Sequence, residues 1–228
     1  MSKAGANFVH QEGLFDPRYA RKVRIIGAGS VGSFVTLFLA KMGVKDIEVQ
    51  DADTVMSHNT PASLYGHSDI GRLKVKALAE HVFQLTGVKI RTVPAMYTGE
   101  DLRNVTVIAC VDTMTTRKII WENIKFCPTV DLFCETRVHE WYLEVFAVAP
   151  CNPQDVKKYE DCYYPDEKAA RQTCGHHGIV HVSVRAAQVV ASNLACFWQE
   201  GRKKWRYSER ADSLEVVFSN PEQIKEGV

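Results

Sequence analysis

The stretch VRIIGAGSVGSFVTLFLAKMG, residues 23–43, decides the fold, and DIEVQD, residues 46–51, completes the unit. VRII has the composition of a short buried strand, and a glycine-rich turn follows it. The apolar spacing is then helical up to Gly43, and a second strand ends at Asp51. This order predicts a right-handed βαβ unit with parallel strands.

The turn contains the pattern G-x-G-x-x-G, formed by Gly27, Gly29 and Gly32. Glycine permits a tight turn and the close approach of a phosphate, and the helix start directs free N–H groups at negative charge. Asp51 lies at about the offset where an acidic side chain meets a ribose hydroxyl in dinucleotide folds. The pattern therefore predicts a nucleotide site. NAD(P), FAD and ATP remain open at this point, as does a turn that binds nothing.

Strands and helices continue to alternate downstream. We expect helices over residues 74–85, 113–126 and 180–198, and strands within 89–97, 105–112, 129–135, 141–150 and 213–218, with a basic turn at 201–206. This alternation predicts a doubly wound α/β fold with a mostly parallel, Rossmann-like sheet, as a single domain over residues 1–228.

Two segments break the alternation. The polar start, residues 1–16, is typical of an N-terminal arm rather than of a core. Residues 151–178 are polar and contain prolines and cysteines, which predicts a long loop. Loops of that length inside compact domains are usually functional or disordered.

The composition argues against several classes of protein. The 28 basic and 27 acidic residues give a net charge of +1, so no global field favours nucleic acid or an anionic membrane as partner. No stretch reaches the roughly 18 apolar residues of a membrane span, and the N-terminus lacks the apolar region of a secretion signal. Seven cysteines, an odd number, favour reduced thiols. We therefore expect a cytoplasmic protein.

Three blocks in series resemble the ThiF/MoeB/HesA family, which is related to ubiquitin-activating enzymes. Residues 51–78, DADTVMSHNTPASLYGHSDIGRLKVKAL, resemble the family pattern Asp-x-Asp, Ser-Asn, Asp-(Ile/Val)-Gly and lysine, at Asp51, Asp53, Asn59, Asp69, Ile70, Gly71 and Lys74. ACVDTMTTR resembles Cys-x-Asp-Asn-x-x-x-Arg, which places Asp112 and Arg117. CYYPD and TCGHHGIV are similar to the family's crossover loop, here within residues 151–178.

The resemblance implies that the nucleotide is MgATP. Its phosphates would lie over Gly29 to Gly32 and its ribose near Asp51, and Ser30 stands where the family places a glycine that touches the nucleotide. Lys74 would neutralise phosphate charge, and Asp112 would hold Mg²⁺. A carrier carboxylate would attack the α-phosphorus and release pyrophosphate, which is mainly a matter of positioning and charge stabilisation. The residues that would bind the cofactor are Gly27, Gly29, Ser30, Gly32, Asp51, Asp53, Asn59, Lys74, Asp112 and Thr113.

The implied partner is a small ubiquitin-like or sulfur-carrier protein with a C-terminal glycine, and the implied assembly is a homodimer. Pro61, Ala62 and Ser63 stand where the family has an arginine and a glutamine. Arginine is the natural bidentate partner for a developing phosphate charge. In the family a second arginine near the N-terminus reaches across a dimer, and Arg18 or Arg21 would be its counterpart here.

The cysteines carry a further expectation. Cys174 falls where thiamine-pathway members place the cysteine that takes over the activated carrier, and the following helix start and two histidines favour a thiolate. A loop cysteine without a role is the alternative. Zinc is not expected, because the chain has no Cys-x-x-Cys pair and a mixed set of Cys162, Cys174, His176, His177 and His181 has irregular spacing. Cys110, Cys134 and Cys196 look structural.

Other functions remain open. The loss of the family arginine favours a catalytically impaired subunit that depends on a partner. Within the adenylating class, a dehydratase acting on tRNA is an alternative, suggested only by the basic turn GRKKWR. An NAD(P)-dependent oxidoreductase would explain the glycine loop and Asp51 but not Lys74 or Asp112.

Overall fold

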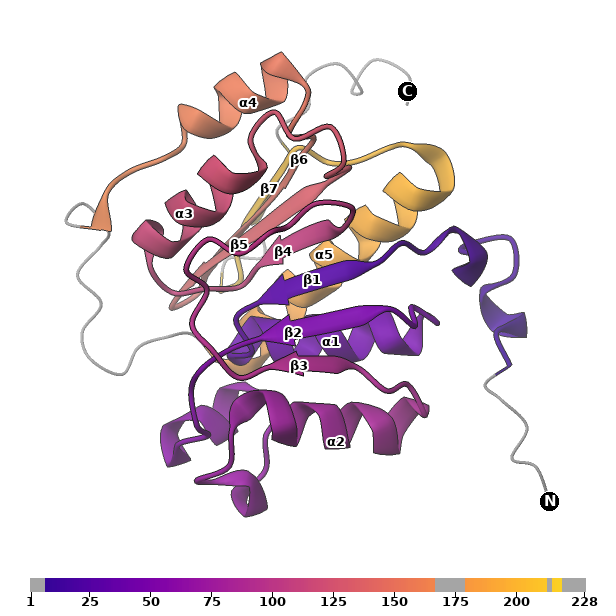
Figure 1. Ribbon diagram of the computed structural model, residues 1–228, viewed down its shortest axis with the longest axis vertical. Coiled ribbons are helices and arrows are strands. Elements are labelled where there is room, and N and C mark those ends of the chain that lie inside the picture. The colour runs from indigo at the N-terminus through magenta and orange to yellow at the C-terminus, as the bar shows by residue number, and fades with distance from the viewer. Residues whose placement is uncertain (1–6, 167–178, 213–214, 219–228) are drawn as a thin grey trace.

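The computed structural model describes residues 7–166, 179–212 and 215–218, the last segment by its backbone (Figure 1). One eight-stranded sheet runs through the molecule in the order β3-β2-β1-β4-β5-β6-β7-β8. Its strands are β1 Val23–Ile26, β2 Ile47–Gln50, β3 Arg91–Val93, β4 Thr106–Ala109, β5 Phe133–His139, β6 Tyr142–Val148, β7 Arg206–Arg210 and β8 Glu215–Phe218. The first five strands are parallel, and β6, β7 and β8 continue the sheet in antiparallel pairs.

Helices cover both faces of the sheet. They are α1 Ser30–Lys41, α2 Lys74–Thr86, α3 Met114–Ile124, α4 Pro153–Glu160 and α5 Val180–Glu200, with short 3-10 helices η1 Val9–Gln11, η2 Pro17–Tyr19, η3 Ser57–Ala62 and η4 His67–Asp69. Apolar side chains of α1, α2 and α5 share one core cluster, and those of α3 and α4 share the other. Figure 1 shows the two helix layers on opposite sides of the sheet. The predicted doubly wound α/β fold is confirmed.

The sequence of α1 explains its place in the fold. Val31, Val35 and Leu39 recur every four residues, so they form one stripe along the helix, and all three are buried. That stripe packs in the same cluster as Val23 and Ile25 of β1. Ile26 belongs to the cluster on the other face, which makes β1 a strand buried on both sides.

The strand order defines a region outside the carboxyl ends of β1 and β4, which we call the crevice. β1 lies between β2 and β4, and Ile26 pairs with Ala109, so β1 and β4 end at the same level. The chain leaves β1 for one side of the sheet and reaches β4 on the other, which is the topological switch point of a doubly wound sheet. Ligands in such folds bind outside the carboxyl ends of the strands at this point.

Two local predictions were wrong, and one strand was not predicted. Residues 153–160 are the helix α4 rather than loop, because Asn152 caps its start and Pro153 occupies its first turn. The strand β7 was not predicted, and it begins at Arg206, the last residue of the expected basic turn. Phe15, in the predicted arm, is 5% exposed and packs against Trp198 at 6.2 Å between ring centroids.

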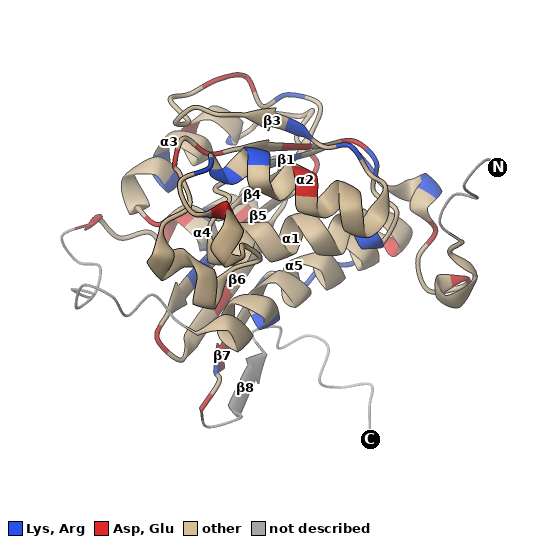
Figure 2. Ribbon diagram, turned by 90° about the horizontal axis from the view of Figure 1, so that it is seen from below, with Lys and Arg blue, Asp and Glu red and all other residues tan. Residues whose placement is uncertain are grey.

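The charged residues and the helix lengths add two observations. Lysine, arginine, aspartate and glutamate are intermixed along the described elements, in keeping with the net charge of +1 (Figure 2).

Among the described residues, no helix combines the length and the apolar character needed to cross a bilayer.

Candidate nucleotide site

The glycine loop connects β1 to α1 at the switch point. Gly27 has φ +97°, and a Cβ there would lie 2.4 Å from the carbonyl oxygen of Cys110. A Cβ on Gly32 would lie 2.0 Å from the carbonyl oxygen of Gly27. Glycine is therefore required at both positions, once for the turn and once for packing the helix on the loop. At Gly29 no atom lies within 4 Å of a Cβ, which leaves open space at the helix start.

The start of α1 offers unpaired donors. No hydrogen-bond acceptor is recorded within the described part of the chain for the N–H groups of Gly29, Ser30 and Val31. They lie at the N-terminal end of a 12-residue helix, where the helix dipole favours negative charge. Such an end is suited to a phosphate.

Asp51 braces this loop from the end of β2. One carboxylate oxygen accepts the N–H of Ala28 at 2.7 Å, and the other accepts the N–H of Asp53 at 2.8 Å. The sequence predicts a contact between Asp51 and a ribose. In the structure its carboxylate orients the backbone of the loop. The ribose contact stays a prediction.

Lys74 begins α2 and meets Asp53. Its Nζ lies 2.7 Å from an Asp53 carboxylate oxygen, and its side chain is 10% exposed against 64% for Asp53. The Lys74 N–H also donates to the Asp53 carbonyl at 2.9 Å. Two residues predicted for the site are thus brought together, with the carboxylate of the pair facing solvent.

Asp69 holds the segment that leads to Lys74. Its carboxylate accepts from the Gly66 N–H at 2.8 Å and from Arg72 at 3.0 Å, and lies 2.6 Å from His81 Nε2. Burial raises the pKa of Asp69, but the hydrogen bonds from His81 and Gly66 outweigh burial and lower the pKa below its ordinary value. Asp69 is therefore a structural anchor of this segment.

Asp112 and Thr113 follow β4 on the other side of the crevice. Asp112 is exposed, and no partner for its carboxylate is recorded among the described residues. Thr113 caps α3 by accepting the Thr116 N–H at 3.2 Å, so its hydroxyl is already engaged. No group of three or more metal-ligating side chains occurs in residues 7–166 and 179–212. A Mg²⁺ ion at Asp112 would therefore complete its shell with phosphate oxygens and water, as this ion usually does.

A buried ionic cluster lies behind the Asp112 loop. The Arg117 guanidinium donates to the carbonyl of Val111, next to Asp112, and to that of Thr136 at 2.9 Å. It also lies 3.0 Å from the fully buried Glu135 carboxylate. Tyr159 of α4 donates to that same carboxylate. The sequence places Arg117 in a block that resembles the family but gives Glu135 and Tyr159 no role, although a glutamate inside the apolar run TVDLFCE was a visible signal.

Asp166 ends the block CYYPD, which resembles the family's crossover loop, but the sequence gives it no individual role. Its carboxylate accepts the N–H groups of Met114 and Thr115, at 2.6 and 3.0 Å, and so caps α3 beside Asp112. The hydrogen bond from the Thr115 hydroxyl is the largest effect that lowers the pKa of Asp166. The 51 or 52 residues between the partners explain why no local pattern indicated this contact.

Asn59 and its neighbours form η3. The Asn59 side chain accepts the Met56 N–H at 2.8 Å, and the Ser63 hydroxyl donates to the Asn59 carbonyl at 2.6 Å. Pro61, Ala62 and Ser63 bring no cation to the site where the family has an arginine. The contact of Asn59 with a nucleotide stays a prediction.

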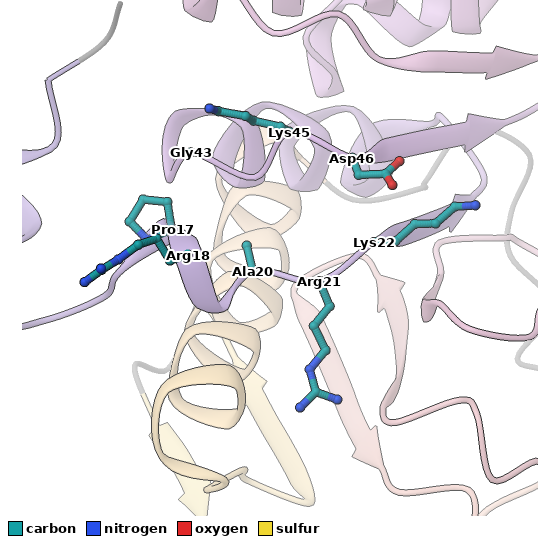
Figure 3. Close-up of a pocket in the computed structure, with 8 residues that line it drawn as sticks. All are labelled: Pro17, Arg18, Ala20, Arg21, Lys22, Gly43, Lys45 and Asp46. Carbon is teal, nitrogen blue, oxygen red and sulfur yellow. The ribbon is translucent and has the colours of Figure 1, made fainter.

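Arg18 and Arg21 do not join the crevice. They precede β1, at the amino end of the sheet, whereas Gly27 follows β1 at its carboxyl end. They line a hollow of about 400 Å³ with Lys22 and Lys45, and Figure 3 shows their side chains pointing away from each other. Within the chain, Arg18 pairs with Asp16 and Arg21 with Asp131. A role of Arg18 or Arg21 in a nucleotide site across a dimer stays a prediction.

The cysteines are partly described. Cys174, His176 and His177 lie outside the described residues. Cys134 is buried, and burial raises the pKa of its thiol. Burial also raises the pKa of Cys110, to about 12, so both thiols stay protonated at neutral pH.

The fold and the crevice define a Rossmann-like α/β protein with a candidate nucleotide site at the switch point. Within this class the chain belongs to the ThiF family, whose model matches residues 5–207. The adenylyltransferase and sulfurtransferase uba4 of Emericella nidulans is 31% identical over 110 residues, which are 43% of this chain and 22% of that protein.

Solved structures with a similar fold include MccB of E. coli with AMPCPP and MccA, with a TM-score of 0.69 at 13% identity over 90% of this chain and 65% of that one. MccB with ATP gives 0.68 at 14% identity, over 92% and 65% of the two chains. PaaA gives 0.69 at 17% identity, over 93% and 75%. At these identities the similarity shows the fold.

Proposed function

We propose that this protein is an ATP-dependent adenylyltransferase that activates the C-terminal carboxylate of a small ubiquitin-like or sulfur-carrier protein. The observation that carries the proposal is the set of groups at the carboxyl ends of β1 and β4. One side of the crevice presents the free N–H groups of Gly29, Ser30 and Val31, and the other presents the exposed Asp112 carboxylate. Anion-binding donors opposite a metal-binding carboxylate suit a magnesium-bound triphosphate better than a nicotinamide cofactor.

The reaction is a substitution at the α-phosphorus. An oxygen of the carrier carboxylate forms a bond to that phosphorus, the bond to the bridging oxygen of the β-phosphate breaks, and pyrophosphate leaves. Asp112 would hold Mg²⁺, which screens the phosphate charge when bound. The N–H groups at the start of α1 and the Lys74 ammonium would bind and orient the phosphates.

The relatives support a polypeptide as substrate. MccB has been solved with ATP and with MccA, and uba4 is described as an adenylyltransferase and sulfurtransferase. A transfer of the activated carrier to Cys174 would form a thioester and release AMP. This step and the homodimer in which Arg18 or Arg21 reaches a partner's nucleotide are parts of the same proposal.

One observation favours a second candidate. Pro61, Ala62 and Ser63 supply no cation, and Arg18 and Arg21 lie at the opposite edge of the sheet. A chain that binds ATP but depends on a different partner for the arginine would have this arrangement.

Exchange of labelled pyrophosphate into ATP tests the proposal. A carrier protein that ends in glycine is added, and a carrier without that glycine is the matched control. The proposal expects exchange that needs both Mg²⁺ and the intact carrier terminus. ATP binding without exchange by any carrier would favour the partner-dependent subunit.

A further inference from the structure

The Ala28 residue of the glycine loop is held on both sides. It is fully buried, its N–H donates to an Asp51 carboxylate oxygen at 2.7 Å, and its carbonyl accepts the Tyr65 hydroxyl at 2.6 Å. Each of these bonds engages a different peptide unit. Because a peptide unit is planar, the two bonds fix the orientation of both units that flank Ala28.

The second of these peptide units, Ala28–Gly29, is the one that would face the nucleotide phosphates. The carbonyl of Ala28 and the N–H of Gly29 belong to the same peptide plane and point in opposite directions. The Gly29 N–H has no recorded acceptor within the described residues, and it leads into the free N–H groups of Ser30 and Val31. The Tyr65 hydroxyl therefore sets the direction of the first free donor in the loop.

The surroundings make Tyr65 a dependable donor. Its side chain is 3% exposed, and burial, with the nearby carboxylates of Asp51 and Asp69, raises its pKa, so the hydroxyl keeps its proton. The adjacent Leu64 N–H donates to the Ser33 hydroxyl of α1 at 3.2 Å. The segment that follows Pro61, Ala62 and Ser63 is thus attached to the glycine loop and to α1.

We propose that Tyr65 is a positioning residue for the nucleotide phosphates, because its hydroxyl holds the Ala28–Gly29 peptide unit in the orientation that presents the Gly29 N–H to them. The inference rests on the proposed function, which places ATP phosphates at this loop. Without the hydroxyl the unit can rotate about ψ of Ala28 and φ of Gly29, and a glycine tolerates the change of φ.

The substitution Tyr65→Phe removes the hydroxyl and keeps the ring. We expect the dissociation constant for MgATP to rise about three- to tenfold, as for the loss of one hydrogen bond. The dissociation constant for adenosine, which has no phosphate, should stay unchanged. Hydrogen exchange of a peptide covering residues 27–31 should become faster in the nucleotide-free protein.

Tyr97→Phe is the matched control. Tyr97 is 5% exposed, and its hydroxyl also donates to a backbone carbonyl, that of Glu100 at 3.0 Å, but in the other core cluster. This variant should bind MgATP and exchange at residues 27–31 as the unaltered protein does.

The outcomes separate two failures. Equal MgATP affinity in Tyr65→Phe and the unaltered protein would overturn the role of Tyr65 alone. A parallel loss of adenosine binding, or the same loss in Tyr97→Phe, would overturn it as well, because general weakening of the fold would explain both. If the unaltered protein binds no ATP, the proposed function and this inference are both overturned.

Discussion

At the scale of single residues, the candidate site contains groups that we expect to contact a ligand and groups that hold the surrounding backbone in place. Lys74 and Asp112 carry charges suited to a magnesium nucleotide, and Asp112 is exposed. The polar side-chain atoms of three other residues form hydrogen bonds with the protein backbone, namely those of Asp51, Asp69 and Tyr65. Predictions at this scale therefore differ: the first kind changes ligand affinity, and the second also changes stability.

Removal of the Lys74 ammonium should weaken ATP binding with little effect on folding. We expect Lys74→Ala to raise the dissociation constant roughly 10- to 100-fold, the loss of a hydrogen bond to a charged group. Its partner Asp53 is 64% exposed and stays solvated without the lysine. Lys76→Ala is the control, because the Lys76 ammonium contacts Thr92 instead. Isothermal titration measures both, and equal affinities would contradict the role of Lys74.

The Asp69 anchor should show in the pH dependence of stability. Its folded pKa lies below the ordinary value of 3.8. The carboxylate therefore stabilises the fold fully above the unfolded pKa, and this contribution is lost as the pH falls through the folded pKa. We expect Asp69→Asn to lower the free energy of unfolding by about 1.5–3 kcal/mol at pH 7 and by much less at pH 2.

Urea unfolding at the two pH values measures the effect of Asp69→Asn. The control is Asp101→Asn, since Asp101 pairs with Arg103 on the surface and exposed pairs contribute little. A destabilisation by Asp69→Asn that is the same at both pH values would argue against the anchor.

At the scale of elements, two glycines of the glycine loop have different expected roles, one in folding and one in ligand binding. A Cβ on Gly32 would lie 2.0 Å from a backbone oxygen, whereas Gly29 has open space. Gly32→Ala should therefore lower the melting temperature strongly or prevent folding. Gly29→Ala should fold normally, since an alanine there costs at most about 1 kcal/mol as a helix cap.

The two alanine variants differ in binding as well. The added methyl group of Gly29→Ala occupies the space at the start of α1, so MgATP affinity should fall. Circular dichroism melting and calorimetric titration check the pair. Unchanged MgATP affinity in Gly29→Ala would place the phosphates elsewhere.

The start of α3 depends on a carboxylate from a distant segment. Asp166 caps two N–H groups of α3, so Asp166→Ala should lower the free energy of unfolding by about 0.5–2 kcal/mol. Asp161→Ala is the control, because no side-chain contact of the exposed Asp161 is recorded among the described residues. Denaturant unfolding of the two variants gives the difference, and equal stabilities would contradict the cap.

The elements also show why sequence patterns succeed and fail. The βαβ unit from β1 to β2 was predicted because its signals are local: a buried strand, three glycines and one helical stripe. The helix α4 was missed although Asn152 and Pro153 form a helix start, since its polar composition was taken for loop. β7 was missed because it is a polar strand that contains Arg206, Ser208 and Glu209. Its polar side chains are satisfied by hydrogen bonds to other side chains of the fold, which the sequence does not reveal.

At the scale of the whole molecule, the sheet order 3-2-1-4-5 brings together residues that the sequence could only name. Lys74 and Asp112 were predicted from two of the blocks that resemble the family, and the glycine loop from its own pattern between a strand and a helix. The contacts of Tyr65 with Ala28 and of Asp166 with Met114 bridge 37 and 52 residues, and no local pattern encodes them. The same order separates Arg18 and Arg21 from the crevice.

That separation predicts how two copies would cooperate. If Arg18 or Arg21 acts on a partner's nucleotide, then a double Arg18→Ala, Arg21→Ala variant and an Asp112→Ala variant should each lose pyrophosphate exchange. Mixing the two should restore part of it, because each mixed dimer holds one intact site and dimers of identical chains hold none. No recovery in a mixture shown to exchange subunits would contradict action across a dimer.

The most direct test of the central claim is calorimetric titration with ATP plus Mg²⁺ and, separately, with NADH. The account predicts Mg²⁺-dependent ATP binding that is lost in Asp112→Ala, and no binding of NADH. Binding of NADH, or ATP binding that is indifferent to Mg²⁺ and to Asp112, would contradict the adenylating site.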